Sequence, residues 1–311
     1  MPNIICIAGP TASGKTALAV ALAQELNAEV VSCDSMQVYR GMDIGTAKPT
    51  AEEMQGVVHH MLDVADPNED FSVSRYCQMA TPIVEDILTR GKNVIIAGGT
   101  GLYMDALIRG NSFAPYPATG MREKLEAQAD NDGMPAMLAL LESIDPQAAS
   151  KLHLADRKRI LRALEVYYET GKTITAHNLE TQAQPPRYNP LWLGLTDENR
   201  ENLYRRIDHR VEVMVEAGLL DEIDTLLASG ISPRCTAMQA IGYKEFLGVR
   251  DGKCSLDDAV RQVQQASRNY AKRQLTWFRR NPAVHWLLRH SHWGTEEIVL
   301  LARQFLGEFD N

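Results

Sequence analysis

The sequence predicts an α/β fold: a P-loop, doubly wound parallel sheet with an inserted helical subdomain. Residues 4–23 join an apolar run, a glycine-rich loop and a helical pattern. Residues 1–110 alternate apolar runs with helical periods, whereas the roughly 70 residues after 120 show helical periods and no convincing strand. Repeated β-α-β order is typical of a parallel sheet that binds ligands beyond the carboxyl ends of its strands.

The glycine-rich loop has the pattern of a phosphate-binding loop. Residues 9–16 match G-x-x-x-x-G-K-[ST], and the loop residues are Gly9, Pro10, Thr11, Ala12, Ser13, Gly14, Lys15 and Thr16. The glycines let backbone N–H groups close around an anion, Lys15 adds a positive charge, and Thr16 can offer its hydroxyl to Mg²⁺. The pattern indicates a polyphosphate or a diphosphate without distinguishing them; the alternative is an ordinary glycine-containing turn.

Further elements follow in order along the chain. We expect strands at 3–9, 28–34 and 92–99, and helices at 15–26 and 73–90, the second with Ser72 as its N-cap and Gly91 just past its end. Pro- and Gly-containing stretches at 112–120 and 184–190 bound the insertion. The predicted division is 1–112 for the first part of the core, 113–190 for the inserted subdomain and 191–311 for the second part. This last part begins with a strand at 191–195 and is expected to be helical from there to the C-terminus.

Candidate functional residues end two of the predicted strands, close to the expected position of the phosphate-binding loop. Asp34 ends the second strand, where a carboxylate can coordinate Mg²⁺ or act as a general base, or else only cap the next turn. The third strand ends in Gly98, Gly99 and Thr100, where many P-loop NTPases carry an acidic residue that helps to hold Mg²⁺. This departure argues against an ATPase. The glycines permit close backbone approach to a ligand and Thr100 can contact a phosphate or an acceptor, although a tight turn would also explain the glycines.

The charge distribution points to a local polyanion site. A formal net charge of −8 argues against a uniformly basic surface. However, residues 261–293 hold seven Lys or Arg and no Asp or Glu, in a helix with a capping-box pattern at 255–258 and Pro282 beyond its end. A helical wheel places one basic set opposite one packing set, Arg261, Arg268, Lys272 and Arg279 against Val263, Ala266, Tyr270 and Trp277. In the insertion, the same reasoning places Lys158, Arg159 and Arg162 opposite Ile160, Leu161, Leu164 and Tyr168. Either stripe alone is typical of a solvated face, but two stripes on an acidic protein indicate a polyanion held between core and insertion.

The cysteines, the apolar runs and the adjacent histidines bear on the cellular compartment of the protein and on metal binding. The five cysteines form no C-x-x-C pair and no metal-ligand spacing, which fits free thiols in a reducing cytoplasm. We expect neither a secretory leader nor a membrane span, since the first strand starts within three residues and no apolar run approaches about 18 residues. For His59, His60 and Asp63 we expect loop packing rather than metal binding, because no further ligand sits at helical spacing.

Taken together, these motifs resemble those of the tRNA dimethylallyltransferases, also called tRNA isopentenyltransferases. The resemblance runs almost end to end, through GPTASGKT, DSMQVYRGMDIGTAKP, HHMLDVADPNEDFSV, GGTGLY, RKRILRALEVYYETGK, RRIDHRVEVMVEAGLLDEI, AIGYKE and KRQLTWFRRN. It implies transfer of the dimethylallyl group of dimethylallyl diphosphate to N6 of adenosine 37, beside the tRNA anticodon, with Mg²⁺ as cofactor. The P-loop would then hold an isoprenoid diphosphate and not ATP. With no cysteine after Cys254 to supply a zinc finger, the chain is similar to the compact bacterial form.

The resemblance also implies roles for individual residues. Asp34 would take a proton from the adenine amine, and Thr100 would lie where the two substrates meet. The charge of the departing diphosphate would be neutralised by Lys15, by Thr16 with its Mg²⁺, and by an arginine, which is Arg210 or, as second choice, Arg206. Because a stacked base cannot be reached, the adenine is expected to flip out onto Asp34, Ser35, Met36, Gln37 and Thr100. The implied contacts to the anticodon stem-loop are Arg122, Lys158, Arg159, Ile160, Leu161, Arg162, Gln239, Ala240, Ile241, Gly242, Tyr243, Lys244, Lys272, Arg273, Gln274, Leu275, Thr276, Trp277, Phe278 and Arg279. We further expect a cytoplasmic monomer with no membrane partner.

Two other functions fit parts of the pattern. A small-molecule kinase that uses ATP would share the P-loop and the fold, but it would not need so large a basic clamp. A nucleotide-switched RNA-binding protein without chemistry would not need Asp34 facing the loop.

Overall fold

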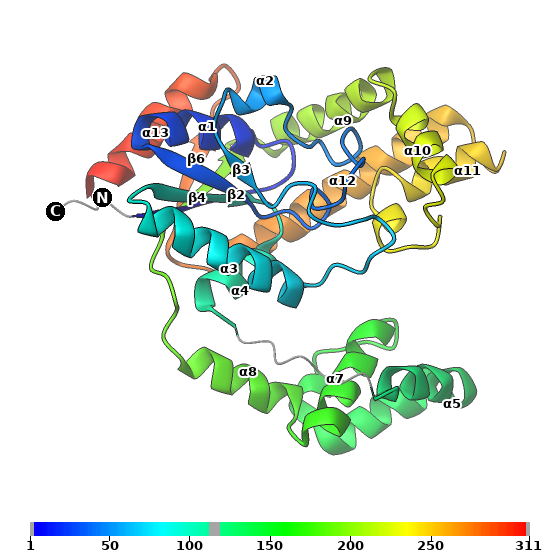
Figure 1. Cartoon of the computed structure of the whole chain (residues 1–311). Helices are drawn as coiled ribbons and strands as arrows, with labels where there is room; N and C mark the ends of the chain where they lie inside the picture. Colours follow the sequence, from blue (N-terminus) through cyan, green and yellow to red (C-terminus); the bar gives the residue numbers. More distant parts are fainter. Residues whose placement is uncertain (1–2, 112–118, 309–311) are drawn as a thin grey trace. The chain divides into compact units, whose positions relative to one another are not determined.

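The computed structural model describes residues 3–111 and 119–308 (Figure 1). The chain forms two compact units, one of residues 1–110 and 187–311 and one of residues 111–186. The first predicted division, at 112, lies outside the described residues. The second, at 190, stays a prediction beside the observed junction at 186. None of the helices in the described ranges is long and apolar enough to cross a membrane.

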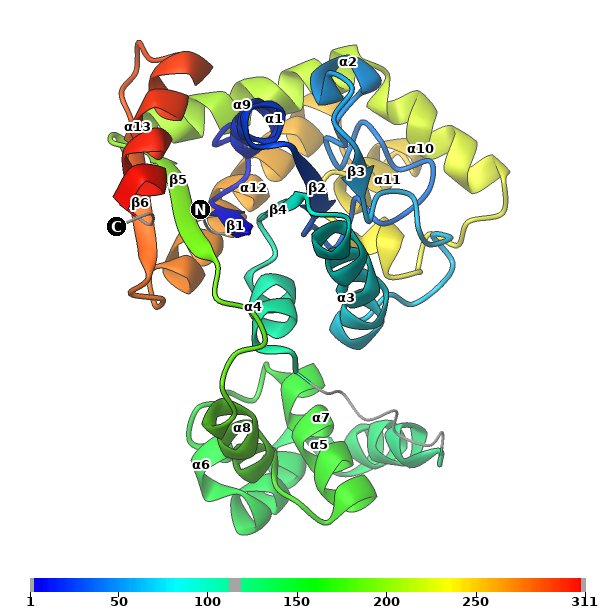
Figure 2. The same cartoon turned by 60° about the vertical axis from the view of Figure 1, so that its left-hand side comes forward.

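The larger unit is built on one parallel sheet of six strands in the order β3-β2-β4-β1-β5-β6. The strands are β1 (Ile4–Ala8), β2 (Ala28–Ser32), β3 (His59–His60), β4 (Asn93–Gly98), β5 (Leu191–Asp197) and β6 (Val284–Arg289). Helices α1 (Lys15–Leu26) and α13 (Thr295–Glu308) cover one face, and α3 (Val73–Thr89) and α4 (Gly101–Arg109) cover the other (Figure 2). The predicted doubly wound sheet is therefore confirmed.

The early elements follow the sequence closely. Helix α1 begins and ends at the predicted residues, and Ser72 caps α3 by accepting a hydrogen bond from the N–H of Arg75 at 3.2 Å. The prediction of helix from 196 to the C-terminus is wrong, because β6 pairs along its length with β5 at the sheet edge. A short apolar run such as VHWLLR cannot be distinguished from a helical segment by its periodicity.

The remaining helices of this unit lie near the carboxyl ends of the strands. They are α9 (Arg200–Glu216), α10 (Leu219–Ala228), the 3-10 turn η1 (Ala237–Gln239), α11 (Lys244–Arg250) and α12 (Leu256–Phe278), with the short α2 (Ala51–Met54) on the way from β2 to β3. Ser255 caps α12 by accepting from the N–H of Asp258 at 3.1 Å, as the capping-box pattern predicts. Helix α12 packs against α9, α11 and α4, so the long basic helix is a wall of the unit and not an appendage.

The smaller unit is helical throughout its described residues. It contains α5 (Met121–Ile144), α6 (Pro146–Ala149), α7 (Arg157–Thr170) and α8 (Ile174–Ala183), and α5 kinks at Gly133, whose φ is 80°. Asp145 joins these helices, since it accepts from the N–H of Ala148 at 3.0 Å and from the hydroxyl of Thr175 at 2.7 Å. Of the predicted packing face of α7, Ile160, Leu161 and Leu164 are fully buried, whereas Tyr168 is 45% exposed.

Candidate active site

The phosphate-binding loop connects β1 to α1 with the geometry that its glycines permit. Gly9 and Gly14 have φ values of 154° and 94°, which L side chains rarely adopt. A Cβ on Gly9 would lie 2.3 Å from the carbonyl oxygen of Leu195, so the close approach to β5 itself requires glycine. The Lys15 ammonium donates to the Pro10 carbonyl at 2.7 Å and so lies folded over the loop. The loop therefore has the strand, turn and helix context of an anion site.

Three side chains support this loop from the strand side. Arg206 donates from Nε to the carbonyl of Ala12 at 2.9 Å and forms a two-point ion pair with Asp197, whose side chain is completely buried. Arg289 at the end of β6 donates to the carbonyl of Ser13 at 3.4 Å. Arg206 is thus committed to the back of the loop, which leaves Arg210, four residues along α9, as the arginine that faces the ligand side.

One cavity of about 360 Å³ brings the predicted chemistry together. It lies within the larger unit, and its lining residues come from the P-loop, from the loop after β2, from the end of β4 and from α9, α12 and the loop after η1. The lining includes the predicted site residues Thr11, Lys15, Thr16, Asp34, Ser35, Met36, Gln37, Arg210, Gln239, Ala240, Ile241, Gly242, Arg273 and Gln274. The ammonium of Lys15, the guanidinium of Arg210 and the carboxylate of Asp34 thus line the same cavity.

Burial inside this cavity changes the ionisation of its cations. Desolvation, followed by the nearby charge of Arg210, lowers the pKa of Lys15 to about 7, although Asp34 raises it. Burial likewise lowers the pKa of the Arg210 guanidinium. A bound anion would relieve both costs, so the electrostatics of the cavity favour a multiply charged ligand.

Asp34 both caps a turn and faces the cavity. Its Oδ1 accepts hydrogen bonds from the N–H groups of Met36 at 2.8 Å and Gln37 at 3.3 Å. Within the described part of the chain, Oδ2 accepts no hydrogen bond. The turn-capping alternative and the catalytic prediction are therefore compatible, because one oxygen fixes the carboxylate while the other can serve the cavity.

Thr100, between β4 and α4, lies beside the residues that follow Asp34. Its Oγ1 accepts from the N–H of Ser35 at 3.0 Å, and it is outside the cavity lining found among the described residues. It also hydrogen-bonds Tyr270, whose pKa rises to about 12 mainly through burial and the neighbouring Asp34. The structure thus places Thr100 where it can orient Ser35 and Tyr270; its direct contact with substrates stays a prediction.

The residues expected to contact tRNA divide by burial. The exposed members are Lys158, Arg159, Gln239, Lys244, Lys272, Arg273, Thr276 and Arg279. Six others are buried, and their contact with tRNA stays a prediction: Ile160, Leu161, Gly242, Tyr243, Gln274 and Phe278. Gln274 bridges two loops of the site, accepting from the N–H of Thr11 at 2.8 Å and donating to the carbonyl of Gly99 at 3.0 Å.

Helix α12 departs from the simple division into a basic face and a packing face. Arg268 pairs with Asp208 of α9 and Arg261 with Asp258, so two members of the basic stripe already have carboxylate partners. On the other side, Tyr270 and Val263 line the cavity and are not ordinary core residues. The helical wheel placed Val263 and Tyr270 on one side of the helix but could not show that this side borders the cavity.

Charged residues of the smaller unit are engaged with one another. Arg122 pairs with Glu126 at 3.0 Å, and Arg162 pairs with Glu165 at 2.8 Å. Arg159 contacts Asp156 at 3.4 Å. These are exposed or half-buried pairs that a phosphate can replace at small cost, since such pairs contribute about 0–1 kcal/mol.

The two adjacent histidines make separate structural contacts. His60 bonds Glu29 at 2.8 Å, and Glu29 is also held by Arg90 and Lys92. His59 contacts the carbonyl of Val57 through Nδ1. Across the described ranges, no three His, Cys, Asp or Glu side chains are grouped as a metal site. These contacts give the histidines a packing role at the sheet edge.

Sequence reasoning missed an apolar wall of the cavity. Ile207, Val211 and Met214 of α9 line it together with Val263. Their spacing of four and three residues predicts that they share one face of a helix. From the sequence we considered only the arginines of this motif.

Comparison with known proteins identifies the family. The model of the IPP transferase family matches residues 37–281. The chain is 43% identical to a tRNA dimethylallyltransferase of Acetivibrio thermocellus, covering 99% of each chain, and 45% identical to one of Geobacter sulfurreducens, covering 98% of this chain and 97% of that one.

Solved structures show the same likeness. A tRNA isopentenylpyrophosphate transferase of Bacillus halodurans superposes with a TM-score of 0.74 at 43% identity, covering 99% of this chain and 96% of that one. A eukaryotic dimethylallyltransferase solved while acting on tRNA has a TM-score of 0.81 at 30% identity, covering 98% of this chain and 79% of that one. On its sequence, its fold and the composition of its cavity, the chain belongs to the IPP transferase family, among the bacterial tRNA dimethylallyltransferases.

Proposed function

We propose that the chain transfers the dimethylallyl group of dimethylallyl diphosphate to N6 of adenosine 37 in tRNA and releases diphosphate. The observation that carries this proposal is the single cavity that contains Lys15, Thr16 and Arg210 together with Asp34. Membership of the family supports the reaction class. The cavity supports the division of labour within it, with cations for a leaving group and a carboxylate for an incoming amine.

The donor end works by charge neutralisation. The allylic C–O bond breaks as negative charge builds on the diphosphate, and Lys15 and Arg210 stabilise that charge from opposite elements, α1 and α9. The apolar wall of Ile207, Val211 and Met214 suits the five-carbon group.

The residues present fit Mg²⁺ bound chiefly through the substrate. Thr16 offers a hydroxyl at the cavity, and Mg²⁺ commonly takes one or two protein oxygens with substrate phosphate oxygens and water completing its octahedron. When bound, the ion would add positive charge beside the leaving group. Thr16 would hold it, and Lys15 and Arg210 would orient the diphosphate.

The acceptor end works by proton removal. As the new C–N bond forms between the allylic carbon and N6, a proton leaves the amine, and Oδ2 of Asp34 would take it. The Oδ1 contact with the N–H of Met36 and the position of Asp34 in the cavity lining support this role. Ser35, Met36 and Gln37 would surround a flipped adenine, and Thr100 would fix Ser35 through its backbone N–H.

The exposed Lys and Arg of α12 and of the smaller unit would hold the anticodon stem-loop through its phosphates. We place the reaction in the cytoplasm, where tRNA is found and where the five free cysteines would remain reduced, and we propose that the chain acts as a monomer.

The test is incubation of the purified protein with unmodified tRNA, dimethylallyl diphosphate and Mg²⁺, followed by mass analysis of the nucleosides. The proposal expects N6-dimethylallyladenosine at position 37 and none without the isoprenoid. An RNA that binds but stays unmodified would favour a binding protein. Transfer of a phosphate from ATP to a small molecule would favour a kinase.

A further inference from the structure

One wall of the cavity is made by two loops that are distant in sequence. We call it the acceptor wall: Gly45, Thr46, Ala47, Gln239, Ala240, Ile241 and Gly242. The first three belong to the loop that follows Asp34, and the others are the last residue of η1 and the three residues after it. Neither loop belongs to the sheet, so their positions must be fixed by side-chain contacts.

Glu222 of α10 joins the acceptor wall to the helices behind it. Its Oε2 accepts from the N–H groups of Asp43 at 2.8 Å and Ile44 at 2.7 Å, and its Oε1 accepts from the N–H of Gly45 at 3.1 Å. The hydroxyl of Tyr243 donates to the same Oε1 at 2.7 Å. Four donors from both loops therefore converge on one carboxylate.

The two loops also fit each other sterically at this point. A Cβ on Gly45 would lie 2.5 Å from the ring of Tyr243, and that ring is completely buried. Burial and the adjacent Glu222 raise the pKa of Tyr243, which keeps its phenol protonated as a donor. A side chain at position 45 would therefore clash with this ring, so the two loops pack closely here.

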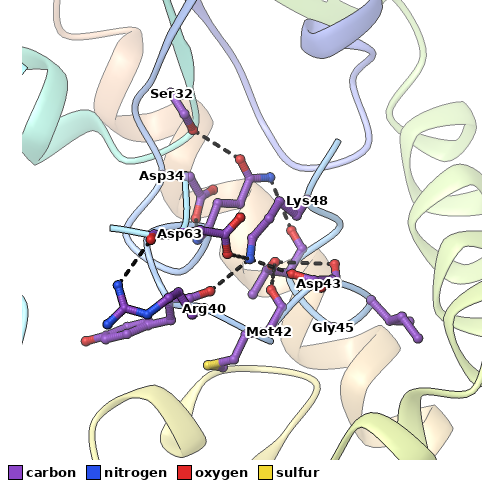
Figure 3. A network of polar contacts seen from close by, with 12 residues as sticks. Ser32, Asp34, Arg40, Met42, Asp43, Gly45, Lys48 and Asp63 are labelled. Carbon is purple, nitrogen blue, oxygen red and sulfur yellow. Dashed lines mark hydrogen bonds and ion pairs between the residues drawn. The ribbon is translucent and has the colours of Figure 1, made fainter. Parts of the chain in front are cut away.

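From Gly45 the connection continues to the residues around Asp34 (Figure 3). The carbonyls of Thr46 and Ala47 accept from Nε2 of Gln37 at 3.3 and 3.0 Å, and Oε1 of Gln37 accepts from the hydroxyl of Ser32 at 3.1 Å. The N–H of Gln37 in turn donates to Oδ1 of Asp34. A path of hydrogen bonds thus runs from Glu222 to Asp34.

Lys48 closes the same loop from the other side (Figure 3). Its side chain is 6% exposed, its ammonium donates to the carbonyl of Tyr39 at 2.8 Å, and it pairs with Asp43 and Asp63. Lys48 therefore sets the internal shape of the loop, whereas Glu222 sets its place against the loop after η1.

We propose that Glu222 is a positioning residue for the acceptor nucleoside: it holds the acceptor wall at the distance from Asp34 that an adenine requires. This rests on the proposed function. Glu222 is not itself in the cavity lining of the described chain and touches no reacting atom. Its effect is confined to the acceptor end, because Lys15, Thr16 and Arg210 lie on α1 and α9, outside this network.

The substitution Glu222→Gln tests this with little change in volume. An amide has one acceptor oxygen, and it would turn an NH₂ group toward N–H donors that now bond a carboxylate, so the wall should detach locally. We expect kcat/KM for tRNA to fall by about 10- to 100-fold, corresponding to one or two lost charge-assisted hydrogen bonds. The KM for dimethylallyl diphosphate and the thermal midpoint should stay near those of the unchanged protein.

Two further variants separate positioning from general damage. Glu216→Gln makes the same change at an exposed carboxylate at the end of α9 and should leave every constant unchanged. Tyr243→Phe removes one donor and keeps the ring against Gly45, so it should give a smaller loss in the same constant.

The results separate this inference from the function on which it rests. An unchanged kcat/KM for tRNA in Glu222→Gln overturns the positioning role, as does an equal loss for both substrates. If the unchanged protein makes no prenylated adenosine, the proposed function itself is wrong.

Discussion

Arg206 and Asp197 form a two-point ion pair directly behind the phosphate-binding loop, with Nη1 2.8 Å from Oδ1. The same guanidinium supports the loop through the carbonyl of Ala12. Arg210, one turn further along α9, lines the cavity and lies 3.5 Å from the hydroxyl of Thr11. Two arginines of one motif thus lie differently: the first supports the loop from behind and the second lines the cavity.

This division predicts opposite phenotypes for matched substitutions. Arg210→Gln should slow prenyl transfer by about 10²- to 10³-fold, the loss typical of one group that stabilises developing negative charge, and should leave the thermal midpoint nearly unchanged. Arg206→Gln should lower the free energy of unfolding by about 3 kcal/mol, because Asp197 is left buried without its partner. Thermal melts and single-turnover rates distinguish them; a stable Arg206→Gln protein whose transfer rate is as low as that of Arg210→Gln would reverse the assignment.

The lowered pKa of Lys15 predicts a pH dependence for donor binding. In the free protein the pKa is about 7, and a bound diphosphate favours the charged ammonium, so binding above pH 7 should take up a proton. Affinity should therefore weaken as the pH rises beyond about 7, by at most about tenfold per unit. Calorimetric titration at pH 8 in buffers of different ionisation enthalpy measures this uptake. Lys15→Arg, which stays charged, is the control; equal uptake in both proteins would contradict the prediction.

Asp34 can be tested without disturbing the turn that it caps. Asp34→Asn keeps an Oδ1 acceptor for the N–H of Met36 but removes the base. Transfer should slow by about 10²- to 10⁴-fold while tRNA affinity is retained. A titration with Mg²⁺ belongs in the same experiment, since restoration of the rate at high metal would mean that the carboxylate serves the metal instead. A rate near that of the unchanged protein would exclude Asp34 as the base.

The exposed part of the α12 stripe predicts a salt effect. Lys272→Ala and Arg279→Ala should each weaken tRNA binding without changing which tRNA is preferred, and each should make the slope of log affinity against log salt shallower by about 0.7 to 0.9. Arg303→Ala is a matched control, because Arg303 lies on α13 and pairs with Glu25 of α1. Identical slopes in all four proteins, the unchanged one included, would mean that the stripe is only a solvated surface.

The fold was predictable where local pattern and burial agree. The glycine loop, α1 and Ser72 at the start of α3 follow from short-range signals, and these elements lie where expected. Strand β6 was not predictable in the same way, since its six residues form a strand only because β5 offers an edge to pair with.

The sequence predicted which residues form the site better than it predicted how their side chains are arranged. Lys15, Thr16 and Asp34 follow from motif and strand position, and the cavity brings them together. Gln274 was expected among the tRNA contacts on the resemblance of its motif, and spacing alone does not show that its side chain accepts a hydrogen bond from the N–H of Thr11. Tyr270 was assigned to a packing face because a helical wheel cannot separate a core from a cavity. Both features depend on tertiary contacts that sequence spacing does not encode.

We propose that the P-loop holds an isoprenoid diphosphate rather than ATP. The most direct measurement is the amount of diphosphate released per N6-dimethylallyladenosine formed, in a reaction that contains tRNA, dimethylallyl diphosphate and Mg²⁺ but no nucleoside triphosphate. We expect one diphosphate for each modified adenosine. Added ATP should leave the rate unchanged, except where it competes with dimethylallyl diphosphate for the P-loop. A requirement for ATP, or its hydrolysis in proportion to product, would contradict it.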